Sequence, residues 1–228
     1  MYEPVGFRIY TAVDRPEKER VALLDGIPGC YLTDFMNRSY CMRPYIRPQT
    51  DHYMIGTAIT VKAPMGDNLM IHKAIDLAQE GDVIVVDGEG GTDRSVVGEM
   101  MVRRAAEKGI RGIVVDGMTR DAAGIRKAGI AVFSRGSTMK GSNRNGPGEI
   151  NVPISCGGLA VLPGDVVIGD ADGVVIVRKD DIEQIAEQAR AKFEREKEKV
   201  ANIEAGGKIG GDRSWIDKSL TEKGITII

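Results

Sequence analysis

The sequence has little cysteine and little histidine. Its three cysteines, Cys30, Cys41 and Cys156, are odd in number and not closely paired, so no disulfide framework is predicted. The two histidines, His52 and His72, are far apart, and no Cys/His zinc spacing occurs. His72 lies inside a predicted helix, and we interpret it as structural.

An excess of one charge is also missing, as are long apolar runs. Lys and Arg total 31 against 33 Asp and Glu, for a formal net charge of −2. This balance argues against a nucleic acid or an anionic membrane as partner. No apolar run approaches the 18 residues of a membrane span. The start, MYEPVGFRIY, shows no basic segment followed by an apolar one, which favours a cytoplasmic protein.

Glycine, by contrast, is abundant. The chain has 29 glycines in 228 residues, where average usage of roughly 7% would give about 16. Nineteen of the 29 lie between Gly81 and Gly173. Since 42% of residues are hydrophobic and proline stays at 9, the composition is globular, and the glycines predict tight turns and close backbone approaches. We expect a single domain over 1–228, with an irregular region at 1–50 and an unassigned tail at 207–228.

The pattern of elements predicts an α/β protein. Apolar strands at 82–88, 112–117 and 130–134 alternate with helices at 98–109 and 121–129, which indicates a parallel sheet covered on both faces. A strand at 55–64 and helices at 16–25 and 67–79 precede this part, with Asp67 or Asn68 as helix cap. Residues 152–177 read as antiparallel hairpins, and 180–205 as one long, charged C-terminal helix.

The glycine cluster in VIVVDGEGGTD resembles a nucleotide loop only superficially. A dinucleotide fingerprint needs G-x-G-x-x-G leading directly into a helix. Asp93 stands where the third glycine belongs, and the next helix begins only near Gly98. We therefore interpret Gly88, Gly90 and Gly91 as part of a flexible loop, which argues against a methyltransferase or a dehydrogenase.

Two other loops at the carboxyl ends of the strands could carry chemistry. The helix that opens with Gly98, Glu99, Met100 and Met101 presents unpaired amides that can bind a carboxylate, or it is an ordinary helix start. In the loop DGMTRD, Arg120 can fork onto an oxyanion and Asp121 can bind a hard cation such as Mg²⁺. The alternatives are that Asp121 caps the next helix and that Arg120 forms a surface ion pair.

Other catalytic patterns are absent or incomplete. G-x-S-x-G does not occur, so no nucleophile elbow is predicted. GDADGVVIV lacks the glycine and glutamate positions of a calcium loop, and we interpret it as a hairpin turn. A Schiff-base lysine stays open; Lys62 would be the strand-borne candidate, without a visible neighbour that lowers its pKa.

Several motifs in sequence order resemble one known family. GTAITVKAP, DNLMIHKAI, GDVIVVDGEG, GEMM, GIVVDGMTRD and INVPISCGGLAVLPGDVVIGDADGVVIV are similar to the RraA-like family, over about residues 55 to 206. That family includes class II 4-hydroxy-4-methyl-2-oxoglutarate and 4-carboxy-4-hydroxy-2-oxoadipate aldolases. The resemblance implies a β/β/α swivelling-type domain, with a central parallel βαβ part, antiparallel hairpins and the long C-terminal helix. It also implies a homotrimer or a dimer of trimers, with sites between subunits.

The resemblance also implies roles for particular residues. Asp121 would bind Mg²⁺ or Mn²⁺ directly, Arg120 would bind substrate and act in catalysis, and the amides of Gly98 to Met101 would hold the substrate carboxylate. Glu99 stands where some members have Asp and would meet the metal through water. Glu196 of a neighbouring subunit would reach the metal shell through water, with Glu194 and Glu198 as alternatives.

The implied activity is cleavage of a 4-hydroxy-2-oxo di- or tricarboxylic acid to pyruvate through an enolate, with oxaloacetate decarboxylation as side activity. The metal would act as Lewis acid, Arg120 would stabilise the oxyanion, and water or hydroxide would serve as base. The alternative is a binding protein that regulates a ribonuclease without catalysis.

Overall fold

The structure is a computed structural model that describes residues 4–211 and 213–225. The chain forms two compact units, which divide after Arg190. The first unit carries the sheet and is α/β, as the sequence predicts. The second contains the end of one long helix and a further helix.

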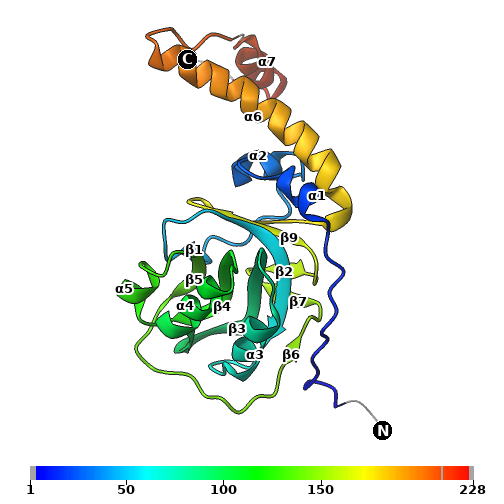
Figure 1. Ribbon diagram of the computed structural model, residues 1–228. Coiled ribbons are helices and arrows are strands. Elements are labelled where there is room, and N and C mark those ends of the chain that lie inside the picture. The colour runs from blue at the N-terminus through cyan, green and yellow to red at the C-terminus, as the bar shows by residue number, and fades with distance from the viewer. Residues whose placement is uncertain (1–3, 212, 226–228) are drawn as a thin grey trace. The chain divides into compact units, whose positions relative to one another are not determined.

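A mostly parallel sheet forms the centre of the first unit (Figure 1). Its strands run in the order β1-β5-β4-β3-β2-β9-β10, with β2 to β5 mutually parallel and β1, β9 and β10 antiparallel to their neighbours. The short β6 also pairs with β2, and β7 and β8 form a separate hairpin. The bounds are β1 (Arg47–Pro48), β2 (Met54–Lys62), β3 (Asp82–Val97), β4 (Gly112–Thr119), β5 (Ala131–Ser137), β6 (Glu149–Ile150), β7 (Ile154–Cys156), β8 (Leu159–Val161), β9 (Val166–Asp170) and β10 (Gly173–Val177).

The helices of the first unit include the connections between parallel strands. These connecting helices are α3 (Leu69–Leu77), α4 (Glu99–Glu107) and α5 (Ala122–Ile125). Before the sheet come α1 (Lys18–Ala22) and α2 (Gly29–Asp34), and after it a 3₁₀ turn (Lys179–Asp181) leads into α6 (Ile182–Glu204). In the second unit, α6 ends and α7 (Ser214–Glu222) lies in the tail that the sequence left unassigned.

Three apolar clusters explain the layering. One cluster packs Ile71, Ile75 and Val102 of the connecting helices on one face of the sheet. A second packs Ile154, Cys156 and Val161 of the β7–β8 hairpin on the opposite face. The parallel sheet is thus covered on both faces, as its apolar strands predict, although a β-hairpin rather than helices covers the second face. A third cluster joins α1 and α2 to β9, β10 and the start of α6.

Strand β3 corrects one prediction. The sequence indicates a strand ending at 88 and a flexible glycine loop, yet β3 continues through Gly88, Gly90 and Gly91 to Val97, with shifts in its register against β4. A Cβ on Gly88 would lie 2.8 Å from the Asp116 carbonyl oxygen, so this glycine lets two strands approach closely. The glycines that signal a turn therefore belong to a bulged strand.

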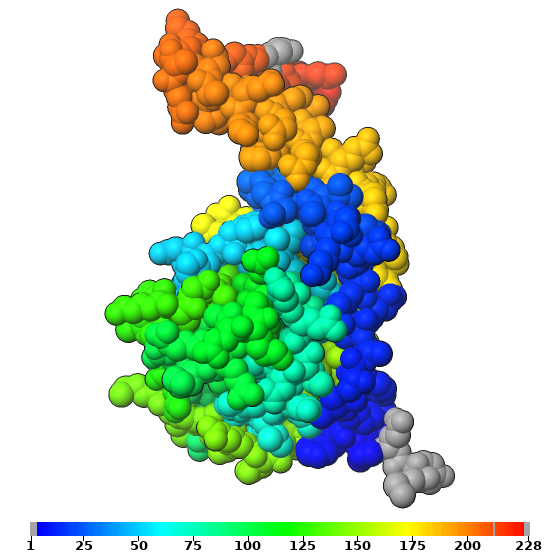
Figure 2. Space-filling model, viewed as in Figure 1, coloured from blue at the N-terminus to red at the C-terminus, as the bar shows by residue number. Residues whose placement is uncertain are grey.

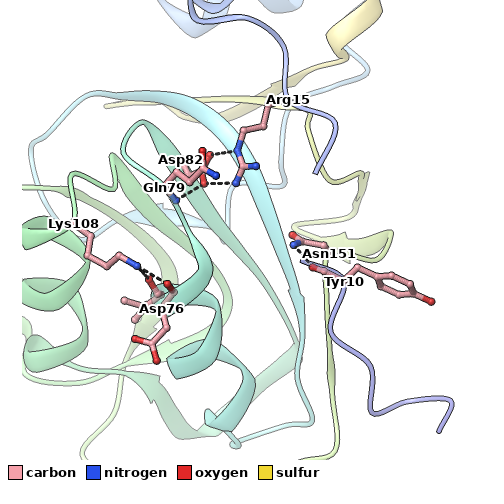
Figure 3. Close-up of polar contacts among 8 residues, drawn as sticks. Tyr10, Arg15, Asp76, Gln79, Asp82, Lys108 and Asn151 are labelled. Carbon is pink, nitrogen blue, oxygen red and sulfur yellow. Dashed lines mark hydrogen bonds and ion pairs between the residues drawn. The ribbon is translucent and has the colours of Figure 1, made fainter. Parts of the chain in front are cut away.

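Residues 4–17, which precede α1, form no helix or strand and lie along the surface of the first unit (Figures 1 and 2). Arg8 pairs with Glu149, and the Asn151 side chain donates a hydrogen bond to the Tyr10 carbonyl oxygen. Arg15 then forks onto the buried Asp82, at 3.1 and 2.9 Å (Figure 3). This segment fastens to the sheet at several points and is called the N-terminal strap (residues 4–15) below.

In the described part of the chain, no helix combines the length and the apolar character that crossing a membrane requires.

Candidate functional site

Helix α4 begins where strand β3 ends. Gly98 is its N-cap residue and has an extended backbone, with no side-chain cap. The Glu99 amide donates to Asp121 Oδ2 at 3.3 Å, and the Met101 amide donates to the Gly98 carbonyl at 3.1 Å. Within the described residues, the amides of Gly98 and Met100 have no acceptor. Two of the four predicted amides are therefore open to a carboxylate.

Arg120 and Asp121 form the turn between β4 and α5, next to the start of α4. The Arg120 amide donates to the Val97 carbonyl oxygen at 3.0 Å, which ties this turn to the end of β3. Asp121 has a left-handed backbone, with φ of 61°, and its carboxylate makes no cap bond to α5. The Asp121 carboxylate therefore does not serve as the cap of α5. Arg120 Nε lies 3.5 Å from Asp121 Oδ2, and both side chains are 47% exposed.

Two glycines make room for these charges. A Cβ on Gly98 would lie 2.8 Å from Asp121 Oδ2, and a Cβ on Gly141 would lie 2.7 Å from Arg120 Nη1. Any larger side chain at either position would displace a charged group. Gly117, which the sequence places at the loop, instead lies within strand β4 and would meet only ordinary contacts.

Glu99 turns toward its own helix and toward α5. Arg103 donates to Glu99 Oε1 at 2.8 Å, and a Cβ on Gly124 would lie 1.9 Å from Glu99 Oε2. The Glu99 carboxylate thus packs against the helix that Asp121 begins. The side chain of Met100 is 76% exposed, whereas Met101 is buried and its Sδ accepts from Asn68 at 3.5 Å.

Glu196 lies in the second unit, on α6, where Lys192 is 3.9 Å from it. Glu194, its alternative, lies 3.8 Å from Lys197 on the same helix. The role of any of these glutamates at a neighbouring subunit's site stays a prediction.

A cavity of about 170 Å³ gathers most of the predicted site residues. It is smaller than the roughly 300–1,000 Å³ of pockets for drug-sized ligands, so it has room only for a small ligand. Its lining joins the start of α4 and the turn at Arg120 and Asp121 to residues from α3 and from the segment after β5. The lining residues are Asn68, His72, Ser95, Val96, Val97, Gly98, Met100, Met101, Arg120, Asp121, Ser142 and Arg144.

Seven of these lining residues were not predicted as site residues from the sequence: Asn68, His72, Ser95, Val96, Val97, Ser142 and Arg144. The sequence offered Asp67 or Asn68 as the helix cap; the Asn68 side chain makes no cap bond, and Asp67 accepts from the Leu69 amide at 2.9 Å. Asn68 is 4% exposed, and its Oδ1 is buried without a hydrogen-bond partner among the described residues. His72 Nε2 is likewise buried and unpaired there. Buried polar atoms without hydrogen-bond partners can be recognised only in the folded structure.

The surroundings of His72 keep its imidazole neutral. Burial lowers the pKa of His72 below its ordinary value, and the positive charges of Arg144 and Arg104 lower it further, while Asp76 opposes them. This lowered pKa favours the neutral form of the ring.

The donor set suits a hard cation that retains water ligands. No group of three or more His, Cys, Asp or Glu side chains able to hold a metal occurs among the described residues. Mg²⁺ needs only one or two protein carboxylates and keeps several waters. Asp121 offers such a carboxylate: it is half-exposed, and its Oδ1 accepts no bond from a described residue. The chain therefore fits Mg²⁺ or Mn²⁺ far better than a four-ligand zinc site.

Comparison with known proteins agrees with this architecture. A family model described as RraA-like, Aldolase/RraA, matches residues 22–176. The "Putative 4-hydroxy-4-methyl-2-oxoglutarate aldolase" of Halalkalibacterium halodurans is 38% identical over 167 residues, which is 73% of this chain and 80% of that protein.

Solved structures point the same way. RraAS2 of Streptomyces coelicolor, described as an unusual member of the RNase ES inhibitor RraA protein family, is 27% identical, with a TM-score of 0.72 over 80% of this chain and 97% of that one. The RNA-processing inhibitor RraA from Thermus thermophilis is 29% identical, with a TM-score of 0.62 over 66% of this chain and 92% of that one. The fold, the order of its motifs and the extent of the match lead to one conclusion: this chain belongs to the RraA-like family of aldolases and RraA proteins.

Proposed function

We propose that this protein is a divalent-metal-dependent aldolase that cleaves 4-hydroxy-2-oxo di- or tricarboxylic acids to pyruvate, with oxaloacetate decarboxylation as a side activity. The observation that carries the proposal is the shared cavity. Arg120, Asp121 and the amide end of α4 line one small space, so a single small 2-oxo acid can meet all three. The family and its aldolase relative support the same chemistry.

Each group has a distinct task in this proposal. The open amides of Gly98 and Met100 bind the 2-oxo acid's carboxylate, because the start of a helix carries partial positive charge. Asp121 holds Mg²⁺ or Mn²⁺ through its half-exposed carboxylate. When bound, the cation supplies Lewis-acid polarisation of the keto group.

Arg120 stabilises the charge that develops during cleavage. Breaking the C3–C4 bond leaves an enolate on the pyruvate half, and in this proposal the guanidinium, 3.5 Å from Asp121, donates to the enolate oxygen. The same enolate arises when oxaloacetate loses CO₂, so one site serves both reactions. We further propose that Glu99, and Glu196 of a neighbouring subunit in a homotrimer or dimer of trimers, hold metal-bound waters.

The test measures pyruvate release from oxaloacetate and from 4-hydroxy-4-methyl-2-oxoglutarate, with Mg²⁺ and then with EDTA. We expect metal-dependent release that EDTA abolishes. Asp121→Asn should lose it, whereas the matched variant Asp172→Asn, an exposed carboxylate at the β9–β10 turn, should keep it. Full activity in EDTA, or in Asp121→Asn, would contradict the proposal.

A ribonuclease regulator is the second candidate, because both structural relatives above are RraA proteins by name. It predicts binding to a ribonuclease of the RNase E type in a pull-down, together with no pyruvate release from either acid. The Arg120–Asp121 pair favours the aldolase, since a pure binding protein has no need of a metal ligand.

A further inference from the structure

Two unpaired polar atoms at one end of α3 need an explanation. Asn68 Oδ1 and His72 Nε2 are buried and without hydrogen-bond partners among the described residues, and both side chains line the cavity that holds Arg120 and Asp121. The His72 amide donates to the Asn68 carbonyl at 3.1 Å, so the two residues sit one helical turn apart on the same face.

Burial of such atoms is unfavourable. An unsatisfied buried polar atom destabilises the folded protein, and native proteins keep few of them. Two in one small cavity, next to a catalytic pair, indicate that a polar group of the ligand completes them. Both atoms are covered in the structure, so the ligand must shift a neighbouring side chain to reach them.

The chemistry of the two atoms restricts the ligand group. Asn68 Oδ1 can only accept a hydrogen bond, so its partner must donate. A neutral imidazole whose Nε2 bears the lone pair also accepts. A carboxylate, which only accepts, cannot satisfy Asn68 Oδ1, whereas a hydroxyl can donate to Asn68 Oδ1 or surrender its proton to a lone pair on His72 Nε2.

We propose that His72 is the general base that takes the proton from the substrate's 4-hydroxyl, and that Asn68 orients this hydroxyl. This inference rests on the aldolase function proposed above and assigns the base to the protein rather than to water. His72 thus has a catalytic role, in place of the structural one expected from its sequence position.

The proposed step couples proton transfer to bond cleavage. Nε2 accepts the hydroxyl proton, the oxygen's electron pair forms the C4 carbonyl, and the C3–C4 bond breaks. Its electrons form the C2–C3 double bond of the pyruvate enolate, whose charge lies on the C2 oxygen beside Arg120. The imidazolium then releases its proton to solvent and C3 takes one from solvent, so the ring returns to neutral. Oxaloacetate decarboxylation has no hydroxyl proton to remove.

Charged neighbours on three segments tune this base. Arg144 follows β5, Arg104 belongs to α4, and Asp76 lies on α3 itself. Burial and the two arginines together lower the pKa of His72 against the opposing charge of Asp76, which favours the neutral ring that a base requires. Because protonation of His72 removes the base, aldol cleavage should fall as the pH drops below the lowered pKa.

The decisive measurement compares two reactions in the same variants. His72→Gln should lower kcat for cleavage of 4-hydroxy-4-methyl-2-oxoglutarate by about 10²–10⁴-fold, the usual contribution of a general base. Oxaloacetate decarboxylation should fall far less, so the ratio of the two rates changes. Lys73→Gln, an exposed neighbour on α3, should leave the ratio as in the wild type. Added imidazole should partly restore cleavage to His72→Ala.

A second measurement tests the protonation state of His72 without requiring catalysis. With only two histidines, His52→Gln leaves a single imidazole signal in nitrogen NMR spectra, and His72 should be neutral at pH 7. Equal losses of both reactions in His72→Gln, wild-type cleavage in that variant, or a charged ring at pH 7 would overturn this proposal. A wild-type protein inactive on both substrates would instead refute the aldolase function itself.

Discussion

At the scale of single residues, the site depends on the close approach of the Asp121 carboxylate to Gly98, which has no Cβ to displace it. Gly98 has φ of −132° and ψ of 175°, which any residue can adopt, so its importance is not one of backbone freedom. What matters is the 2.8 Å between its would-be Cβ and Asp121 Oδ2. A methyl group there must push the carboxylate away from the cavity.

Gly98→Ala therefore separates site geometry from folding. We expect Mg²⁺ binding at least about tenfold weaker, or ~1.4 kcal/mol, with a thermal midpoint close to that of the wild type. Isothermal titration calorimetry and thermal unfolding measure the two quantities. Gly117→Ala, whose Cβ meets nothing nearer than 3.4 Å, is the matched control and should bind metal normally. Unchanged affinity of Gly98→Ala for Mg²⁺ would show that metal binding by Asp121 does not depend on the missing Cβ of Gly98.

The sequence predicted the position of Arg120 and Asp121 because strand-end loops of a parallel sheet converge at one edge. It also left open whether Asp121 caps α5, and the absence of a cap bond answers this. Asn68 and His72 could not be found in the same way. The apolar pattern of their helix predicts that it packs on the core. The sequence gives no sign that a buried polar atom lacks a hydrogen-bond partner.

At the scale of elements, one buried carboxylate joins two walls of the cavity. Asp67 is 4% exposed; its Oδ1 accepts from the Leu69 amide, and its Oδ2 accepts from the Asn145 amide at 2.6 Å and the Gly146 amide at 3.2 Å. Asp67 thereby fixes the segment that carries Arg144 to the start of α3.

Asp67→Ala should reduce the free energy of unfolding by about 1–3 kcal/mol, because it removes a buried carboxylate that accepts hydrogen bonds from three backbone amides. Urea denaturation measures this loss, with Asp172→Asn as a surface control that should stay within about 0.5 kcal/mol of the wild type. Substrate affinity should also weaken, since the wall at Arg144 loosens. A stability equal to that of the wild type would mean that water replaces the carboxylate.

Sequence patterns located most elements but misjudged β3. Predicted strands and helices appear at the expected places from β2 to α6, because their apolar periodicity reflects burial in the three clusters. The run Gly88 to Gly91 carries the residues of a turn, but here glycine allows the β4 backbone to come close. The close approach of two strands depends on tertiary packing, which a local sequence pattern does not specify.

At the scale of the whole molecule, the proposed site takes residues from two subunits. Asp121 belongs to the first unit and Glu196 to the second, and our proposal joins them between neighbouring copies of the chain. Such sharing has a consequence for mixed assemblies, because a defect in one copy can be covered by another.

Mixing two inactive variants tests this sharing. Asp121→Ala and Glu196→Ala should each lose activity alone, and a randomised equal mixture should regain about a quarter of the wild-type rate, since that share of interfaces is intact. Pyruvate release before and after subunit exchange gives the measurement, and mass spectrometry verifies mixing. Glu194→Ala and Glu198→Ala in place of Glu196→Ala identify the glutamate. Mixed assemblies without recovered activity would contradict a shared site.

The N-terminal strap also has a consequence for how the chain is made. Arg8 and Tyr10 of the strap bind Glu149, Ile150 and Asn151, which stand about 140 residues later in the sequence. At synthesis rates of roughly 5–20 residues per second, the strap must wait on the order of ten seconds before its partners leave the ribosome. The contacts of Arg8 and Tyr10 therefore form late in synthesis, although these two residues are made early.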